Sequence, residues 1–502
     1  MLERKRAESS GWSRAGRNFG GAATLGYLMC PQTRRFLAGA ATLLALSAAG
    51  PAHAAEPSPG ETATGAQAKK KGPGRGEKAV AKALRDAVRK KRISRRNYNR
   101  YRKLYSRARK TRKRLKGARG RELGAVIATL DRIALRRRLV GSRMRALFLI
   151  LQRNTEFWPR KPFPRNRDRV TFRGSELLFE YYAGKGLQLQ PLVNFKQANL
   201  MHGACVKPTG APCRRAGLAR LLGEMVKTSS RRGRFRTWEY YFAFGGGAPP
   251  WMSGMAQATG IQAFARASQL LGDPRWLNYA RDSFGAFQTP PPTGVATVGP
   301  LSGTHYLQYS FAPRLFIFNA FLQSVIGLYD YATITGDGAA QRLYARAEPE
   351  ARLEVPASDT GDWSLYSFRG RESTREYHEL LREFMAGLCN RVKAPEYCSA
   401  ARRYSDYMTD PAELVFTGPQ TAVKGQETPV TFDVSKLSAV EITITTQGKT
   451  SLNKVATFRR GPGSFLWKPG TTGTYTVSLA AKELRTGQGL RTRTSGEIES
   501  LP

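Results

Sequence analysis

The chain has 502 residues, of which 82 are Lys or Arg and 37 are Asp or Glu, giving a formal net charge of +45. This length predicts two or three domains, and the 41% hydrophobic content is enough for a core. A charge of this sign and size favours polyanions as partners, namely nucleic acid, anionic lipid or an acidic polysaccharide.

Residues 1–54 have the pattern of a secretory signal region. A short basic segment precedes the apolar run Phe36–Gly50, which is too short to span a bilayer, and Ala52–Ala54 has the small-x-small spacing of a cleavage site. We predict a start at Met29, cleavage after Ala54, a secreted or cell-surface protein, and no membrane span after cleavage. Export argues against nucleic acid as the natural partner.

Residues 55–77 are expected to be a linker, and residues 78–155 a basic helical region. Between positions 69 and 121 there are 25 Lys and Arg residues but only two acidic ones. Apolar residues recur at helical spacing from Leu123 to Ile133, and Gly117 and Gly120 suit the turn of a helical hairpin. We expect the apolar stripe to pack on the next domain and the charge to attract acidic glycan.

The cysteines that follow the signal region form two close pairs in the sequence. They are Cys205, Cys213, Cys389 and Cys398. Two local disulfides are the simplest arrangement, although four cysteines allow three connectivities.

Residues 156–410 contain an internal repeat of apolar helix, tight turn and second helix. The apolar helices are expected at Met255–Leu271, Phe316–Ile334 and Tyr377–Asn390, and the second helices carry Arg281, Arg346 and Arg402. Repeated helical hairpins cannot bury their apolar faces alone and stack on their neighbours. The fold class predicted is therefore mainly α, with an α/α-hairpin toroid, an incomplete α/α barrel, as the central domain.

Residues 411–502 change to the two-residue period of β-strands. Alternating apolar residues occur at Val430–Val434, Val440–Ile444, Val455–Thr457 and Tyr475–Leu479. About seven short strands in this span predict an immunoglobulin-like β-sandwich, which we expect to be an accessory domain.

Five segments carry a family resemblance. They read WMSGMAQATGIQAFARA, HYLQYSFAPRLFIFNAF, VIGLYD, SLYSFRG and REYHELL. Together they resemble the C-terminal part of the D-glucuronyl C-5 epimerases, over roughly residues 180–408. The resemblance implies an α/α-barrel enzyme that inverts glucuronate to iduronate within a polysaccharide.

The resemblance also implies the site. Tyr366 and Arg369 match the family's Tyr-x-x-Arg motif, Tyr377 and His378 match its Tyr-His pair, and Tyr309 matches its upstream tyrosine. The hydrogen at carbon 5 is a poor acid beside a carboxylate, so the enzyme must neutralise that carboxylate and supply an acid and a base on opposite ring faces. We expect Tyr309 and Tyr377 to move protons, Tyr366 to donate a hydrogen bond, and Arg369 to clamp the carboxylate.

Four further residues are candidates for contact with substrate: His378, Gln308, Trp251 and Lys196. The family carries a carboxylate where this chain has Gln308, so a tyrosine must act as the base if activity is kept. Trp251 follows a glycine-rich stretch and could stack on a sugar, or the stretch could simply be a rigid loop.

No cofactor is expected, because HExxH, P-loop and dinucleotide motifs are missing from the sequence, and no metal site is predicted. The expected partners are an acidic polysaccharide substrate and, by electrostatic contact, an anionic cell-wall polymer; a homodimer is left open. Two alternatives remain at this stage, a polysaccharide lyase acting on uronate polymers and a non-catalytic glycan-binding surface protein.

Overall fold

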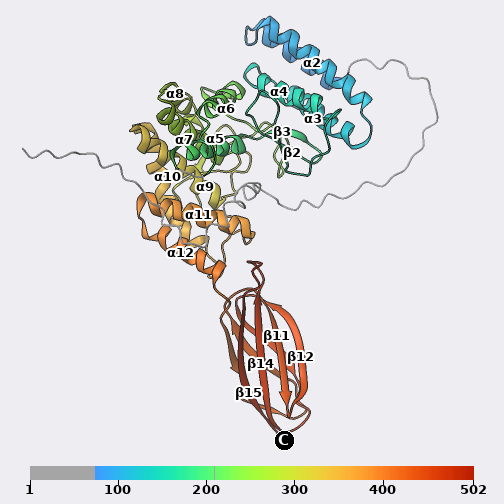
Figure 1. The fold of residues 1–502 in the computed structure, drawn as a ribbon, viewed down its shortest axis with the longest axis vertical. Coiled ribbons are helices and arrows are strands. Elements are labelled where there is room, and N and C mark those ends of the chain that lie inside the picture. The colour runs from blue at the N-terminus through green and yellow to red at the C-terminus, as the bar shows by residue number, and fades with distance from the viewer. Residues whose placement is uncertain (1–73, 208–209) are drawn as a thin grey trace, which may run out of the picture. The chain divides into compact units, whose positions relative to one another are not determined.

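The computed structural model describes residues 74–207 and 210–502 (Figure 1). The predicted signal region, and the linker up to residue 73, lie outside these residues. The described part of the chain holds twelve α-helices, β1–β7 in short sheets among them, and β8–β15 at the C-terminal end. The fold is thus mainly α, as predicted. Over these residues no helix is both long and apolar enough to cross a membrane.

The basic region consists of four helices where a single hairpin was expected. They are α1 (Arg75–Arg89), α2 (Arg95–Arg114), α3 (Gly117–Leu135) and α4 (Gly141–Phe157). Gly117 begins α3 with a φ of 58°, as a turn glycine does, but Gly120 lies inside α3, where an added Cβ would come 2.5 Å from the carbonyl oxygen of Leu115. The close approach of Leu115 to α3, and not a turn, therefore explains the glycine at position 120.

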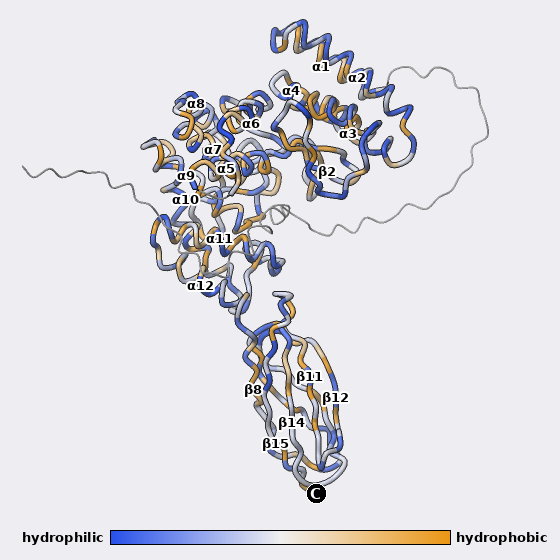
Figure 2. Tube along the Cα trace, viewed as in Figure 1, coloured by the Kyte–Doolittle hydropathy of each residue, from blue (hydrophilic) through white to orange (hydrophobic). Residues whose placement is uncertain are grey.

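The apolar stripe predicted in this region is buried. Leu123, Val126, Leu130 and Ile133 of α3 are all less than 5% exposed. Tyr101 of α2 stacks on Phe148 of α4 with ring centroids 4.3 Å apart. Outside this stripe the tube of α2 is mostly hydrophilic (Figure 2). The helices thus pack through one face and present their charge on the other.

Short strands and two helices join the basic region to the repeat. They are β1 (Arg169–Val170), β2 (Phe179–Tyr182), β3 (Gly186–Leu189), α5 (Pro191–Val206), α6 (Arg215–Thr228), β4 (Ser230–Arg232) and β5 (Phe235–Thr237). Glu239, just after β5, is fully buried and pairs with Arg143 of α4 at 2.7 Å and with Arg232 of β4 at 2.6 Å. Removing one partner of such a buried pair costs about 3–5 kcal/mol. This pairing ties α4 to the strands.

The three helical hairpins occur where the repeat predicts them. They are α7 (Gly254–Leu271) with α8 (Arg275–Arg281), α9 (Phe318–Thr335) with α10 (Gly338–Ala357), and α11 (Arg375–Val392) with α12 (Pro395–Thr409). Gly272 and Gly336 end α7 and α9 in the left-handed conformation, with φ of 65° and 68°. Asp337 caps α10 by accepting from the backbone N–H groups of Ala339 and Ala340.

The hairpins pack on one another in chain order. Helix α5 contacts α7, α7 contacts α9, α9 contacts both α10 and α11, and α11 contacts α12 (Figure 1). One buried apolar cluster runs from Val80 of α1 to Tyr404 of α12. The helical region therefore has a continuous core.

Both expected disulfides are present. Cys205 of α5 is bonded to Cys213, and Cys389 of α11 is bonded to Cys398 of α12. The second bond links the two helices of the third hairpin. Of the three connectivities that four cysteines allow, the chain therefore forms the one with two local disulfides.

The C-terminal region has its own core between two sheets. One sheet has the order β13-β10-β8 and the other the order β12-β11-β14-β15-β9. The strands are β8 (Leu414–Gly418), β9 (Thr421–Val423), β10 (Thr428–Val434), β11 (Ser438–Thr446), β12 (Lys449–Phe458), β13 (Gly461–Trp467), β14 (Gly473–Glu483) and β15 (Arg491–Leu501). Alternate residues such as Val430, Ile442 and Val477 are buried in a common cluster.

Candidate active site

Three tyrosines from two separate segments of the chain line one pocket of about 280 Å³. They are Tyr309, Tyr366 and Tyr377. The ring centroids of Tyr366 and Tyr377 lie 4.8 Å apart in an edge-to-face arrangement. The hydroxyl of Tyr366 interacts with those of both Tyr309 and Tyr377. The structure therefore brings together the three tyrosines predicted to be catalytic.

Tyr309 is held in the loop between β7 (Thr304–Tyr306) and α9. Leu307 donates its backbone N–H to Val295 at 2.9 Å, and Ser310 donates its backbone N–H to Met252 at 3.0 Å. The backbone on both sides of Tyr309 is thus fixed to other segments, which limits the positions open to its ring.

Tyr366 and Tyr377 come from a tight turn and from the helix that follows it. The backbone N–H of Tyr366 bonds to the carbonyl of Arg371 at 2.9 Å, which closes the turn. Phe368 donates its backbone N–H to the carbonyl of Phe316 at 2.9 Å, which fastens the turn to the start of α9. Tyr377 lies in the first turn of α11 and is 7% exposed.

Aromatic rings form the wall beside Tyr309. Phe311 stacks on Tyr309 with centroids 5.2 Å apart, and Phe244 lies 5.8 Å from the same ring. Gly247 makes room for Phe311, because a Cβ there would meet the ring at 2.4 Å. The glycine-rich stretch thus supports the pocket wall, and its Gly245 lines the pocket directly.

Trp251 does not line the pocket. Its ring stacks on Tyr240 at 4.1 Å, and its indole N–H donates to the carbonyl of Phe242 at 2.8 Å. It meets Tyr309 edge to face at 5.6 Å. Trp251 therefore packs against Tyr309 from outside the pocket, and one face of its indole ring is already covered by Tyr240.

The two arginines of the turn are placed differently. Arg371 lines the pocket, whereas Arg369 does not. Arg369 is exposed, has a φ of 52°, and holds its guanidinium over the ring of Phe368 at 5.5 Å. Sequence analysis missed Arg371, although it lies only two residues beyond the motif arginine in the same short turn.

His378 lies in the core and not in the pocket. Its ring is fully buried and stacks on Trp363 at 3.8 Å. Its Nδ1 lies 2.8 Å from the Ser364 hydroxyl, and its Nε2 lies 2.9 Å from the carbonyl oxygen of Tyr404. Burial lowers the pKa of His378 to about 4. Because both ring nitrogens are engaged, this residue joins α11 to α12.

Gln308 is buried next to Tyr309, and its side-chain oxygen accepts a bond from the Ser253 hydroxyl at 3.0 Å. Lys196 lies on α5, half-buried, and is not among the residues that line the pocket. Burial lowers the pKa of Lys196 to about 8, while the charge of Glu383 opposes the shift. Neither side chain is thus placed in the pocket itself.

Burial raises the pKa of both Tyr309 and Tyr366 above the ordinary tyrosine value. Negative charge on Tyr309 raises the pKa of Tyr366 further, and negative charge on Tyr377 raises the pKa of both neighbours. Tyr309 and Tyr366 are therefore kept protonated, as acids and hydrogen-bond donors.

A carboxylate missed by sequence analysis also lines the pocket. Glu372 pairs with Arg485 at 2.8 Å and with Arg459 at 3.2 Å. Both arginines come from the C-terminal β region, so no local motif could have indicated the contact. Across the described residues no group of three or more His, Cys, Asp or Glu is placed to hold a metal ion.

A cation also lies close to the aromatic wall. The ammonium of Lys185 lies 5.8 Å from the ring centroids of Phe242 and Phe244. Lys185 is in the turn between β2 and β3, and Glu122 of α3 accepts the backbone N–H groups of Gly184 and Gly186 in that turn. The basic helices therefore support this turn.

Sequence comparison matches residues 232–406 to the family described as D-glucuronyl C5-epimerase C-terminus. An uncharacterized protein of Methanocaldococcus jannaschii is 24% identical over 189 residues, covering 36% of this chain and 61% of that protein. A D-glucuronyl C5-epimerase of Caenorhabditis elegans is 29% identical over 133 residues, covering 24% of this chain and 22% of that protein. The chain thus matches less than two thirds of the length of either relative.

Two solved structures are similar at 10% identity. A GH76 α-mannanase of Bacteroides thetaiotaomicron has a TM-score of 0.36 and covers 48% of this chain and 66% of its own. An unsaturated glucuronyl hydrolase specific for heparin has a TM-score of 0.29 and covers 45% of this chain and 76% of its own. These scores are too low to assign a shared fold. The sequence match is the informative one, and the residues 232–406 that match the D-glucuronyl C5-epimerase C-terminal family include all three pocket tyrosines.

Proposed function

We propose that this chain is a uronate C5-epimerase that inverts glucuronate to iduronate residues within an acidic polysaccharide. The observation that carries the proposal is the meeting of three tyrosine hydroxyls in one pocket with Arg371 in its lining. Epimerisation at carbon 5 needs a base and an acid on opposite ring faces and a cation for the carboxylate. The pocket contains residues of each kind.

The charges in the pocket suggest a role for each tyrosine. In this assignment Tyr377 acts as a phenolate and takes the proton from carbon 5, because burial raises the pKa of Tyr309 and Tyr366 and suits those two to the roles of acid and donor. Tyr309 then returns a proton on the other face, and Tyr366 donates a hydrogen bond to the developing anion. Arg371 replaces Arg369 as the carboxylate clamp in this assignment, because it lines the pocket.

Gln308 bears on which residue can act as the base. The family carries a carboxylate at that position, and an amide cannot act as a base. Its side-chain oxygen is already engaged by Ser253. The tyrosine mechanism therefore does not depend on a carboxylate at position 308.

The wider setting of the enzyme is part of the same proposal. The stacked hairpins would form an incomplete α/α toroid around the pocket, and the C-terminal sheets an immunoglobulin-like accessory domain. The two disulfides support an oxidising, secreted or cell-surface location. The basic helices would attract the acidic substrate and anionic cell-wall polymer.

A polysaccharide lyase is the nearest alternative, because it forms the same anion and then breaks the bond at carbon 4. Incubation with heparosan separates the two reactions. We expect new iduronate signals in the proton NMR spectrum, unchanged chain length and no ultraviolet-absorbing product. Carboxyl-reduced heparosan is the matched control and should not react. Shortened chains with ultraviolet absorbance would identify a lyase and refute the epimerase.

A further inference from the structure

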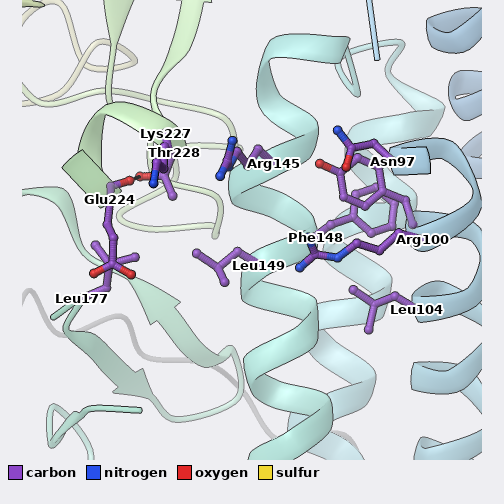
Figure 3. Close-up of a pocket in the computed structure, with 11 residues that line it drawn as sticks. Asn97, Arg100, Leu104, Arg145, Phe148, Leu149, Leu177, Glu224, Lys227 and Thr228 are labelled. Atoms are coloured by element: carbon purple, nitrogen blue, oxygen red, sulfur yellow. Dashed lines mark hydrogen bonds between the residues drawn. The ribbon is translucent and has the colours of Figure 1, made fainter. Parts of the chain in front are cut away.

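A second cavity lies between helices α2, α4 and α6, away from the tyrosine pocket. It has a volume of about 270 Å³ and shares no lining residue with that pocket. Figure 3 shows Arg145 from α4 near Lys227 from α6, and Arg100 from α2 farther away, beside Phe148. Three elements far apart in the sequence thus contribute positive charge to one cavity.

These cations are not neutralised by neighbouring acids. In the part of the chain that the structure describes, neither Arg145 nor Lys227 forms an ion pair, and Arg100 donates only to the neutral Gln152 amide, at 3.0 Å. The one carboxylate in the lining is Glu224, at the end near Leu177 (Figure 3). One oxygen of Glu224 already accepts the backbone N–H of Glu176 at 2.8 Å. The cavity therefore keeps a net positive charge.

The floor of the cavity is fixed and apolar. Tyr101 and Phe148, stacked on each other, line the cavity and are 6% and 1% exposed. Arg100 and Arg145 project from the same two helices, so the packing of these rings fixes the positions of their backbones relative to each other.

The cavity continues into a larger groove on the same helices. The groove, of about 550 Å³, shares Arg100 and Leu104 with the cavity and adds Arg96, Lys103 and Arg107 of α2. Its lining also includes the exposed amide of Asn99, which can bond hydroxyl groups, and the carboxylate of Glu156, which pairs with Arg153 at 3.1 Å. A ligand that follows this path meets several cations in succession, as a polymer with repeated negative charges requires.

The surface suits a polysaccharide better than other polyanions. Single-stranded nucleic acid needs open aromatic faces for its bases, but the rings of Tyr101 and Phe148 are buried. An amphipathic helix that lies on a membrane needs exposed apolar anchors, and α2 has no large apolar side chain among those exposed. A succession of cations, with the exposed amide of Asn99 among them, matches a chain of carboxylates and hydroxyls.

We propose that Arg100, Arg145 and Lys227 form a binding site for a carboxylate of an acidic polysaccharide, outside the tyrosine pocket, and that the adjoining groove holds the neighbouring residues of the same chain. The identity of the polymer rests on the proposed function, but the site is defined by binding and not by turnover. It would hold the polymer on the enzyme while other residues of the polymer react.

The test compares two double variants of the full chain. Arg145→Ala with Lys227→Ala removes two cations of the cavity, and Lys110→Ala with Arg114→Ala removes two exposed cations of α2 that line none of the cavities described above. Affinity for end-labelled heparosan is measured by fluorescence anisotropy at an ionic strength of about 0.15 M. We expect roughly a 10-fold loss for the cavity variant and less than about 3-fold for the control.

Equal losses in the two variants would overturn the site, because net charge alone would then explain binding. Anionic vesicles of phosphatidylserine and a single-stranded oligonucleotide serve as further probes. A selective loss for either of these, with heparosan binding unchanged, would refute the polysaccharide as occupant. Heparosan binding by Tyr377→Phe separates this site from the proposed function, since absence of turnover with binding intact bears only on the tyrosine pocket.

Discussion

Replacing Tyr377 by Phe should lower the rate of epimerisation by about 10³-fold, within the range that general acid–base groups contribute. The substitution removes one hydroxyl from the pocket and keeps the ring that packs against Tyr366 at 4.8 Å. The rate is measured by NMR from the appearance of iduronate in heparosan, and thermal unfolding checks that the variant is folded.

A matched control is Tyr329→Phe. This hydroxyl lies outside the pocket and donates to the carbonyl of Arg391 at 3.1 Å, so its loss should leave the rate within about 2-fold while removing one hydrogen bond of about 1 kcal/mol. Tyr309→Phe should impair return of the proton on the opposite face, and thus differ from Tyr377→Phe between glucuronate-rich and iduronate-rich polymers. Wild-type rates for both pocket variants on both polymers would refute the tyrosine mechanism.

Replacing Arg371 by Ala should lower turnover by about 10²-fold, the scale of losing one group that stabilises a developing anion. Arg369→Ala is the matched comparison, since it removes the same charge from the same turn at a side chain that lies over Phe368 and outside the pocket. We expect it to keep the rate within about 3-fold. The rates are compared at saturating heparosan so that binding does not contribute.

The opposite result is equally informative. A large loss of turnover for Arg369→Ala, with little loss for Arg371→Ala, would show that the arginine of the family motif is the one that binds the carboxylate. It would also mean that the turn rearranges when substrate binds, because Arg369 in this structure does not line the pocket.

The helical hairpins could be predicted from sequence because their signals are local. Gly272 and Gly336 end α7 and α9 in the conformation that glycine adopts most easily, and Asp337 caps α10. The strands of the C-terminal region likewise follow from alternation, since every second residue of β10 and β11 faces the core. The four basic helices were harder to predict, because a glycine such as Gly120 is typical of a turn. Its close contact with Leu115, which explains a glycine inside α3, cannot be seen in the sequence.

The site could be predicted only in part. The three tyrosines belong to recognisable motifs and do meet, but which side chains of a turn face a pocket depends on its hydrogen bonds. Tyr366 bonds to Arg371, and this pairing leaves Arg369 at the tip of the turn. His378 was assigned to substrate from its motif, yet its partners Ser364 and Tyr404 come from elsewhere in the chain. Glu372 similarly meets Arg485 across 113 residues.

Deuterium incorporation at carbon 5 tests the central claim most directly. The full chain is incubated with heparosan in heavy water, and the uronate residues are then examined by NMR and mass spectrometry. Proton abstraction and return by the tyrosine pocket predicts deuterium at carbon 5 in both epimers, and none when Tyr309→Phe and Tyr377→Phe are combined. Bound heparosan that gains no deuterium at carbon 5 with the wild-type chain would contradict the account.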